Sequence, residues 1–368
     1  MKKFAIIIVL LIIVKTSFSQ LAAENYLKKS VDGYVHLYFD EQYYLADQNC
    51  EFKYYTRVCK YSPSTNGFDG FFTDYYNNNT IALTGNYKEG KMDGNFKGFY
   101  PAGIPKFDAF FDDDQPFGTW SFYYPSGEIW LKIQFVNNIA QIKDFWNVYG
   151  VQKVVNGKGK YGFTQEVLNF NEFGYNGINF NGRINNGVPV GNWLTNIVFP
   201  NKSIDFIGNE YYKKGVFISS NYIYPAGVSK KESLLQLYPS FNFYNTKKLT
   251  YKNCTIDDNQ GYNFYLQEYL NNNLPLFWEQ ANSPKASFKV AVVIDSTGKS
   301  LEVSLIDSIA PIQSQLIKQA LQDVNYWIPS FIRGKTIKDT VLITISPVEI
   351  DNQRKTFAYP IIIRNKED

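Results

Sequence analysis

The chain has 368 residues, with 37 Lys and Arg against 34 Asp and Glu and a single His. Apolar residues make up 45% and aromatic residues 18%, so the chain can form sizeable cores in two or three domains. This composition excludes a disordered chain, a collagen and a disulfide-dense scaffold. One His, His36, argues against His-based metal sites and His-based acid–base catalysis.

The first 19 residues have the pattern of a secretory signal peptide. A basic start is followed by an unbroken apolar run at 4–14, and small residues precede a cleavage position between Ser19 and Gln20. The apolar run is too short for a membrane span, which takes roughly 20 residues. We therefore expect an exported protein with no stable membrane span after cleavage. We place it in the periplasm or cell envelope rather than outside the cell.

Cleavage also changes the charge of the chain. It removes three Lys and no acidic residue, which leaves 34 basic residues against 34 acidic ones. A neutral chain lacks the basic footprint that nucleic-acid binding requires. We therefore expect no nucleic-acid partner.

The cysteines suggest one disulfide, because an exported protein folds in an oxidising compartment. Cys50 and Cys59 are nine residues apart across a strand-like stretch. Their pairing would close a small loop or hairpin and leave Cys254 unpaired. The alternative is that Cys50 and Cys59 are two buried thiols.

A repeat rich in Gly and aromatic residues occupies the middle of the chain. Residues 85–96 have Gly, an aromatic residue, Gly, Gly and an aromatic residue at offsets 0, 2, 5, 9 and 11, and residues 182–193 match with Ile184 at the second offset. A weaker copy starts at Ala109, 24 residues after Gly85. Alternating aromatics bury one strand face, and Gly or Asn supplies the tight turns. After a lead-in at 20–66, we predict stacked antiparallel β-hairpins over 67–227.

These hairpins resemble MORN repeats, in the variant found in YwqK-type antitoxin proteins. Residues 118–127 and 187–193 carry the likeness, and residues 54–57 and 71–76 look like the lead-in to such arrays in secreted proteins of Bacteroidetes-type bacteria. The resemblance implies a scaffold or spacer. We expect the aromatic rings to form the hairpin core, the alternative being a platform for glycan or protein.

A module of another kind follows a connection at 228–261. Apolar spacing predicts the order helix, strand, strand, helix, strand, an α+β arrangement. The expected segments are a helix at 264–273, strands at 288–294 and 301–306, a helix at 312–324 and a long strand at 336–346. The fold class is therefore mainly β, with a small α+β domain at 262–347 and a tail at 348–368.

This module resembles the C-terminal domain of TonB energy transducers. The likeness is carried by residues 269–274, 288–299, 327–329 and 334–335. In TonB the last strand accepts a receptor segment as an added strand, a binding mode called β-augmentation. The resemblance implies that an extended segment of an envelope protein, such as an outer-membrane receptor, pairs with Thr340, Val341, Leu342, Ile343 and Thr344.

Two features set limits on this likeness. The chain has no Pro-rich spacer and its N-terminus resembles a cleaved signal, whereas a TonB transducer keeps its membrane anchor. The tail is apolar at 356–363 and can itself pair with the last strand and cover its edge. Self-capping therefore remains open beside partner binding.

No catalytic or metal-binding constellation accompanies these features. Residues 157–162 have Gly-x-Gly-x-x-Gly spacing, but they lie among hairpins with no following helix. Residues 112–114 are three Asp without EF-hand spacing, which favours a solvated turn over a Ca²⁺ site. We expect a non-enzymatic envelope scaffold without cofactors. The alternatives are a glycan- or surface-binding module that uses the array aromatics, and a TonB-like energy transducer for outer-membrane transport.

Overall fold

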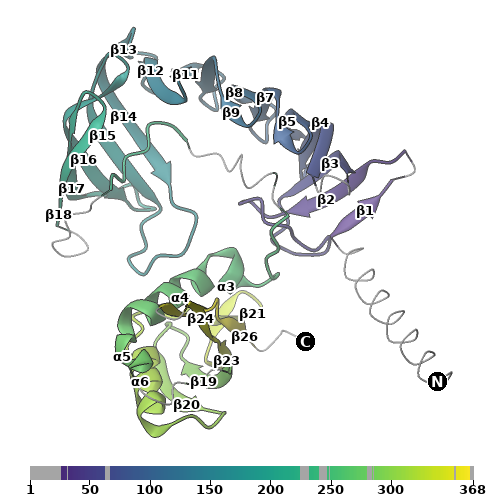
Figure 1. Cartoon of the computed structure of the whole chain (residues 1–368), viewed down its shortest axis with the longest axis vertical. Coiled ribbons are helices and arrows are strands. Elements are labelled where there is room, and N and C mark those ends of the chain that lie inside the picture. The colour runs from purple at the N-terminus through teal and green to yellow at the C-terminus, as the bar shows by residue number, and fades with distance from the viewer. Residues whose placement is uncertain are drawn as a thin grey trace. The chain divides into compact units, whose positions relative to one another are not determined.

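The computed structural model describes residues 26–30, 32–62, 67–223, 232–239, 247, 249–279, 284, 286–351 and 354–364. The chain is mainly β and divides into two compact units (Figure 1). The first unit comprises Met1–Val167 and Asn176–Cys254, and the second comprises Leu168–Tyr175 and Thr255–Asp368. The second unit thus includes a short segment inserted between two strands of the first.

One long antiparallel sheet makes up the first unit. Its strands pair successively in chain order along a curved ribbon (Figure 1), with the two-residue strands β6 and β9 beside the main ladder. The strands are β1 (Leu27–Lys29), β2 (Val35–Phe39), β3 (Tyr55–Ser62), β4 (Gly67–Tyr76), β5 (Ile81–Lys88), β6 (Lys91–Met92), β7 (Gly94–Phe99), β8 (Pro105–Asp112), β9 (Gln115–Pro116), β10 (Thr119–Tyr123), β11 (Ile129–Val136), β12 (Ile139–Trp146), β13 (Gln152–Val155), β14 (Lys158–Glu166), β15 (Gly177–Asn185), β16 (Val188–Val198), β17 (Ile204–Lys213) and β18 (Val216–Tyr222).

Packing explains why a glycine and an aromatic residue recur eleven residues apart in the repeat. A Cβ atom added at Gly85 would lie 2.7 Å from the ring of Phe96, which is eleven residues later on the paired strand. A Cβ atom at Gly182 would lie 2.1 Å from the indole ring of Trp193, at the same offset. Glycine in a strand often marks such a close approach. The first glycine of each copy therefore makes room for the ring at offset 11.

A return segment covers part of the core face of this sheet; its described residues are 232–239, 247 and 249–254. Its apolar side chains, among them Leu237 and Tyr238, pack against the array core, and the Tyr161 hydroxyl donates to the Leu237 carbonyl at 2.5 Å. Farther along, the Thr250 carbonyl accepts the Leu45 N–H at 2.7 Å. The return segment thus links late strands of the array to its beginning.

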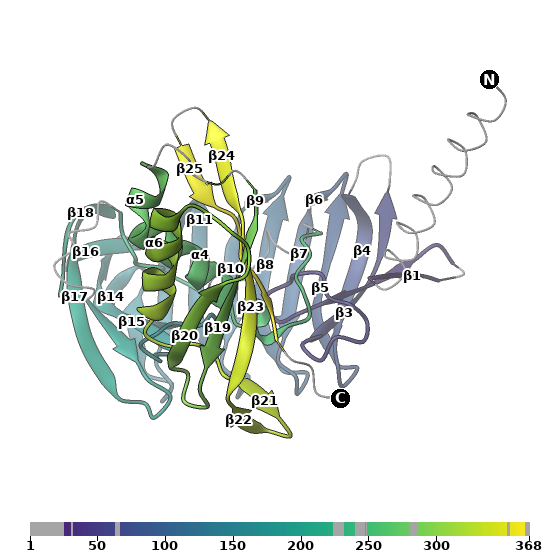
Figure 2. The ribbon, with the colours of Figure 1, turned by 90° about the horizontal axis from the view of Figure 1, so that it is seen from below.

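The second unit is α+β. Strands β20, β19, β23 and β26 form a four-stranded sheet in that order, and Figure 2 shows β20, β19 and β23 side by side with α6 next to them. The elements are α3 (Ile256–Asn259), α4 (Tyr262–Asn273), α5 (Pro275–Trp278), β19 (Phe288–Ile294), β20 (Ser300–Leu305), α6 (Pro311–Gln322), β21 (Ser330–Ile332), β22 (Lys335–Ile337), β23 (Asp339–Ile345), β24 (Pro347–Asp351), β25 (Arg354–Phe357) and β26 (Ile361–Ile363). Helices α4 and α6 bury Leu266, Leu270 and Ile317 in a core shared with the sheet.

The long strand expected at 336–346 is divided in two. β22 turns back to pair with β21, and β23 begins at Asp339, whose carboxylate accepts the Ser330 hydroxyl at 2.7 Å. Asp339 is buried, and a buried carboxylate requires a polar partner. The hydrogen bond from Ser330 therefore fixes Asp339 at the point where β22 has ended and β23 begins.

Candidate interaction site at the edge of the second unit

The strand expected to accept a partner is an inner strand of the sheet. β23 pairs with β19 along its whole length, and Leu342, Ile343 and Thr344 pair on the other side with β26 from the C-terminal tail. Thr340 and Val341 lie on the same strand, just before the paired stretch. Of the two alternatives left open by the sequence, self-capping by the tail therefore holds at Leu342, Ile343 and Thr344, where an open edge was the wrong expectation, whereas the tail strand does not pair with Thr340 and Val341.

The tail is held by a side-chain clamp as well as by strand pairing. Arg364, directly after β26, donates Nε and Nη2 to the two carboxylate oxygens of Asp257 at 2.8 and 2.6 Å. Its Nη1 also donates to the Ser330 hydroxyl at 3.2 Å. Such bidentate, charge-assisted pairs are strong, and Asp257 is buried. We therefore regard β26 as a stable part of the sheet.

The opposite edge of the sheet is β20. Within the described residues β20 pairs with β19 alone. Two large apolar side chains are exposed here, Leu301 of β20 at 47% and Ile306, the residue after β20, at 54% exposure. An edge strand with exposed apolar residues is a ready template for another strand. This edge, rather than that of β23, can accept an extended segment.

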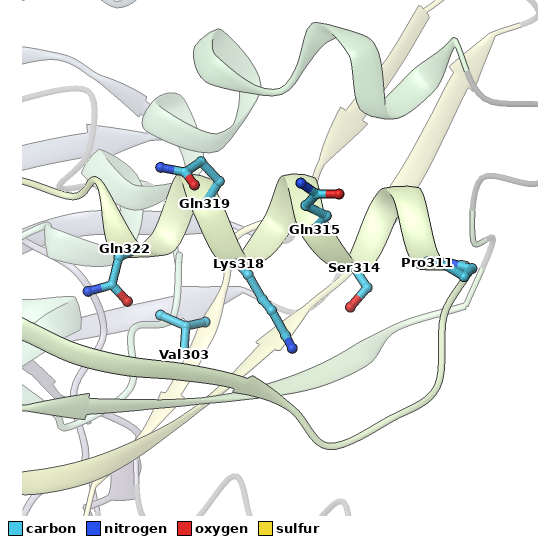
Figure 3. A pocket seen from close by; sticks show the side chains of 7 residues that line it. All are labelled: Val303, Pro311, Ser314, Gln315, Lys318, Gln319 and Gln322. Atoms are coloured by element: carbon cyan, nitrogen blue, oxygen red, sulfur yellow. The ribbon is translucent and has the colours of Figure 1, made fainter.

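A groove of about 500 Å³ runs beside this edge, between β20 and α6. Figure 3 shows Lys318 extending from α6 toward the side on which Val303 of β20 lies. The remaining lining residues come from α6 and are polar apart from its first residue; they are Pro311, Ser314, Gln315, Gln319 and Gln322.

The groove carries a single charged side chain. Lys318 is the one ionisable residue in its lining, and no carboxylate lines it. Gln322 closes one end by donating its Nε2 to the Ser300 carbonyl at 3.0 Å. Glutamine side chains both donate and accept hydrogen bonds. The groove therefore suits polar or acidic side chains of a bound segment better than basic ones.

The array aromatics lie mostly in the core. Trp193 and Trp120 are 0% and 2% exposed, and Trp130 and Trp146 are half-buried. Trp130 stacks on Phe163 with 5.9 Å between ring centroids. These four indole rings therefore do not form a row facing the solvent.

The disulfide differs from the expected one. Cys50 is bonded to Cys254, and Cys59 is a buried free thiol on β3. The expected Cys50–Cys59 pairing is therefore wrong. The return segment brings Cys254 to Cys50 across 204 residues, a long-range approach that spacing in the sequence does not reveal.

The Asp cluster at 112–114 lies in a turn and is paired with lysines. Lys91 contacts Asp113, and Lys247 of the return segment forms an ion pair with Asp114. Asp114 also accepts the Met92 N–H at 2.8 Å. Across the described ranges, no group of three or more His, Cys, Asp or Glu residues is placed to hold a metal ion.

Other expectations concern the N-terminus and membranes. The cleavage position between Ser19 and Gln20 lies outside the described residues. In the part of the chain that the structure describes, no helix has the length and apolar character needed to cross a membrane.

Comparisons with known proteins leave the chain without an assigned family. A scan against models of protein families finds no match, and a search of curated proteins finds no similar sequence.

Proposed function

We propose that this protein is a non-enzymatic binding protein of a bacterial cell envelope, and that its second unit adds an extended segment of a partner protein to β20. The observation that carries the proposal is the open β20 edge beside the α6 groove. Main-chain bonds to an added strand supply affinity, and adjacent pockets supply specificity. The hairpin array serves as the scaffold. The resemblance to TonB and the signal-like N-terminus support an envelope partner, such as a receptor segment.

The backbone of β20 offers defined bonding groups. Ile306 donates its N–H to the Lys289 carbonyl of β19 at 3.0 Å. Because N–H groups alternate in direction along an antiparallel strand, those of Val303 and Leu305 point away from β19. An added strand would pair with these two residues, and its alternate side chains would enter the groove beside Val303.

Site-directed crosslinking in the native host tests the proposal. A photo-crosslinking amino acid replaces Leu301 of β20, or Ile350 on β24 as the matched exposed control. We expect a discrete envelope-protein adduct from position 301 and none from position 350. Val303→Pro should abolish the adduct while preserving the fold, because proline removes only an outward donor at an edge strand.

A charge reversal tests the groove separately. Lys318→Glu should lower the adduct yield roughly two- to fivefold if the bound segment is acidic, whereas Lys335→Glu on exposed β22 should leave it unchanged. Circular dichroism must first show that each variant is folded. An adduct that persists undiminished in folded Val303→Pro would rule out strand addition at β20.

A further inference from the structure

A row of basic side chains crosses the outer face of β14, β15 and β17. Its members are Lys160, Arg183 and Lys213, which are all exposed. Each is adjacent in the chain to a residue buried in the array core; these residues are Tyr161, Ile184 and Tyr212. Side chains alternate between the two faces of a strand, so the three basic residues point away from that core. We call them the basic row.

The basic row follows the hydrogen-bonding direction of the sheet. Lys160 pairs directly with Arg183, and Arg183 pairs with Val190 of β16. The register of β16 with β17 then brings Lys213 opposite Val190. Because adjacent strands lie ~4.8 Å apart, the three charges are spaced along a line at one strand separation and then two.

The protein leaves the charges of the basic row without counter-charges. Within the described residues, none of the three forms an ion pair. On β17, Glu210 is buried and Asp205 pairs with the buried Ile197, so both lie on the core face. Glu166 does lie on the outer face of β14, but it is six positions beyond Lys160, or ~20 Å along the strand.

The same face of the sheet pairs opposite charges at β7 and β8. There Lys97 lies directly opposite Asp108 in the ladder. Opposite charges in such cross-strand pairs stabilise a sheet, whereas like charges directly opposite each other destabilise it. The pair of Lys160 with Arg183 therefore costs stability, and a bound anion would remove that cost.

A phenol ring and an amide border the basic row. Tyr211 lies two positions before Lys213 on the same face of β17 and is 47% exposed. Its cross-strand partner is Asn192, whose side-chain oxygen accepts from Asn209 at 2.5 Å. An amide also has two donor hydrogens, so Asn192 can still donate to a hydroxyl group. Hydroxyl groups as well as anions therefore find partners on this surface.

We propose that the basic row binds an acidic polysaccharide built from uronic acids. Each sugar of such a chain carries one carboxylate and several hydroxyl groups, so an extended chain repeats its charge at regular steps. The carboxylates pair with the lysines and with Arg183 in charge-assisted hydrogen bonds. Hydroxyl groups bond to Asn192, and a sugar ring packs on Tyr211. The signal-like N-terminus favours a polymer of the cell surface over a nucleic acid. This site lies on the first unit and is independent of strand addition at β20.

Fluorescence anisotropy of a labelled alginate oligosaccharide, titrated with the purified full chain, tests the site. We expect binding at about 0.01 M salt that weakens at about 0.15 M, because the Debye length falls from about 30 Å to about 8 Å. Lys160→Glu and Arg183→Glu should each weaken binding roughly five- to tenfold, since each replaces an attraction by a repulsion. Lys160→Glu should not lower the stability of the chain, because it turns a like-charged pair into an oppositely charged one.

Lys97→Glu is the matched control, because it changes the net charge equally at an exposed position of the same face. It should bind alginate as the unaltered chain does. The proposal is overturned if alginate does not bind, or binds equally well at both salt concentrations. It is also overturned if Lys97→Glu weakens binding as much as Lys160→Glu, which would be an effect of net charge alone. Tighter binding to phosphatidylglycerol vesicles or to a DNA duplex than to alginate would overturn the choice of a polysaccharide.

Discussion

The indole ring of Trp193 lies directly over Gly182, so that a Cβ atom at position 182 would come within 2.1 Å of the ring. Trp193 is fully buried and cannot move away without opening the core. Gly182→Ala should therefore lower the free energy of unfolding by about 1–3 kcal/mol, measured by urea denaturation. Gly162→Ala is the control, because its Cβ atom would meet the end of the Asn181 side chain, which can rotate. Equal losses in both variants would contradict this explanation of the repeat.

A buried ion pair holds the first strands of the array together. Arg57 donates Nε and Nη2 to the two oxygens of Asp74 at 2.7 and 2.8 Å, and both side chains are fully buried. Asp74→Asn should destabilise the protein by about 3–5 kcal/mol, because it leaves the Arg57 charge without a counter-charge. The double variant Arg57→Met with Asp74→Leu should recover much of that loss. Calorimetry that finds the double variant less stable than Asp74→Asn would refute this account.

Thiol labelling distinguishes the two disulfide pairings. Cys59 is 1% exposed, whereas Cys254 would be an exposed thiol if it were not bonded. We expect no labelling by a maleimide in the native protein and one thiol per chain after denaturation without reductant. Rapid labelling of the native protein at Cys254, located by peptide mapping, would restore the pairing of Cys50 with Cys59.

The Cys59 thiol should make stability depend on alkaline pH. Burial raises the pKa of this thiol to about 12 in the folded chain, against about 8.5 in an unfolded one. The buried thiol therefore makes its full contribution to the free energy of unfolding below about pH 8.5, and this contribution is lost as the pH rises toward 12. Between pH 8 and pH 10 the chain should lose about 2 kcal/mol more than Cys59→Ala does. If urea titrations showed that the unaltered chain and Cys59→Ala lose the same unfolding free energy between pH 8 and pH 10, the burial of the thiol would be contradicted.

The Arg364 clamp should control access to β23. Arg364→Ala leaves Asp257 buried without its counter-charge, and we expect a loss of about 3 kcal/mol in unfolding free energy. Amide hydrogen exchange at 342–344 should accelerate, because β26 covers these residues. Lys335→Ala, at an exposed position, is the control. Unchanged exchange at 342–344 in Arg364→Ala would mean that strand pairing alone holds the tail.

Short-range features could be predicted from residue type. Asn156–Gly157 and Asn186–Gly187 both have positive φ at the two positions, as expected for tight hairpin turns. The strand expected at 288–294 is β19, and the helix expected at 312–324 is α6 at Pro311–Gln322. These conformations depend on neighbours within a few residues, so the local pattern specifies them.

Pairings between distant segments required the tertiary structure. Residues 301–306 and 336–346 have equally good strand patterns, yet β20 is an edge and β23 is not, because the tail pairs with β23. Cys50 had a nearer cysteine in the sequence, yet the return segment brings Cys254 to it. The sequence by itself determined the alternation of buried and exposed residues along the strands, the hairpin turns, and the glycines that make room for aromatic rings. Which strand stayed open and which thiol stayed free was decided by long-range packing, since local preference is the same for either choice.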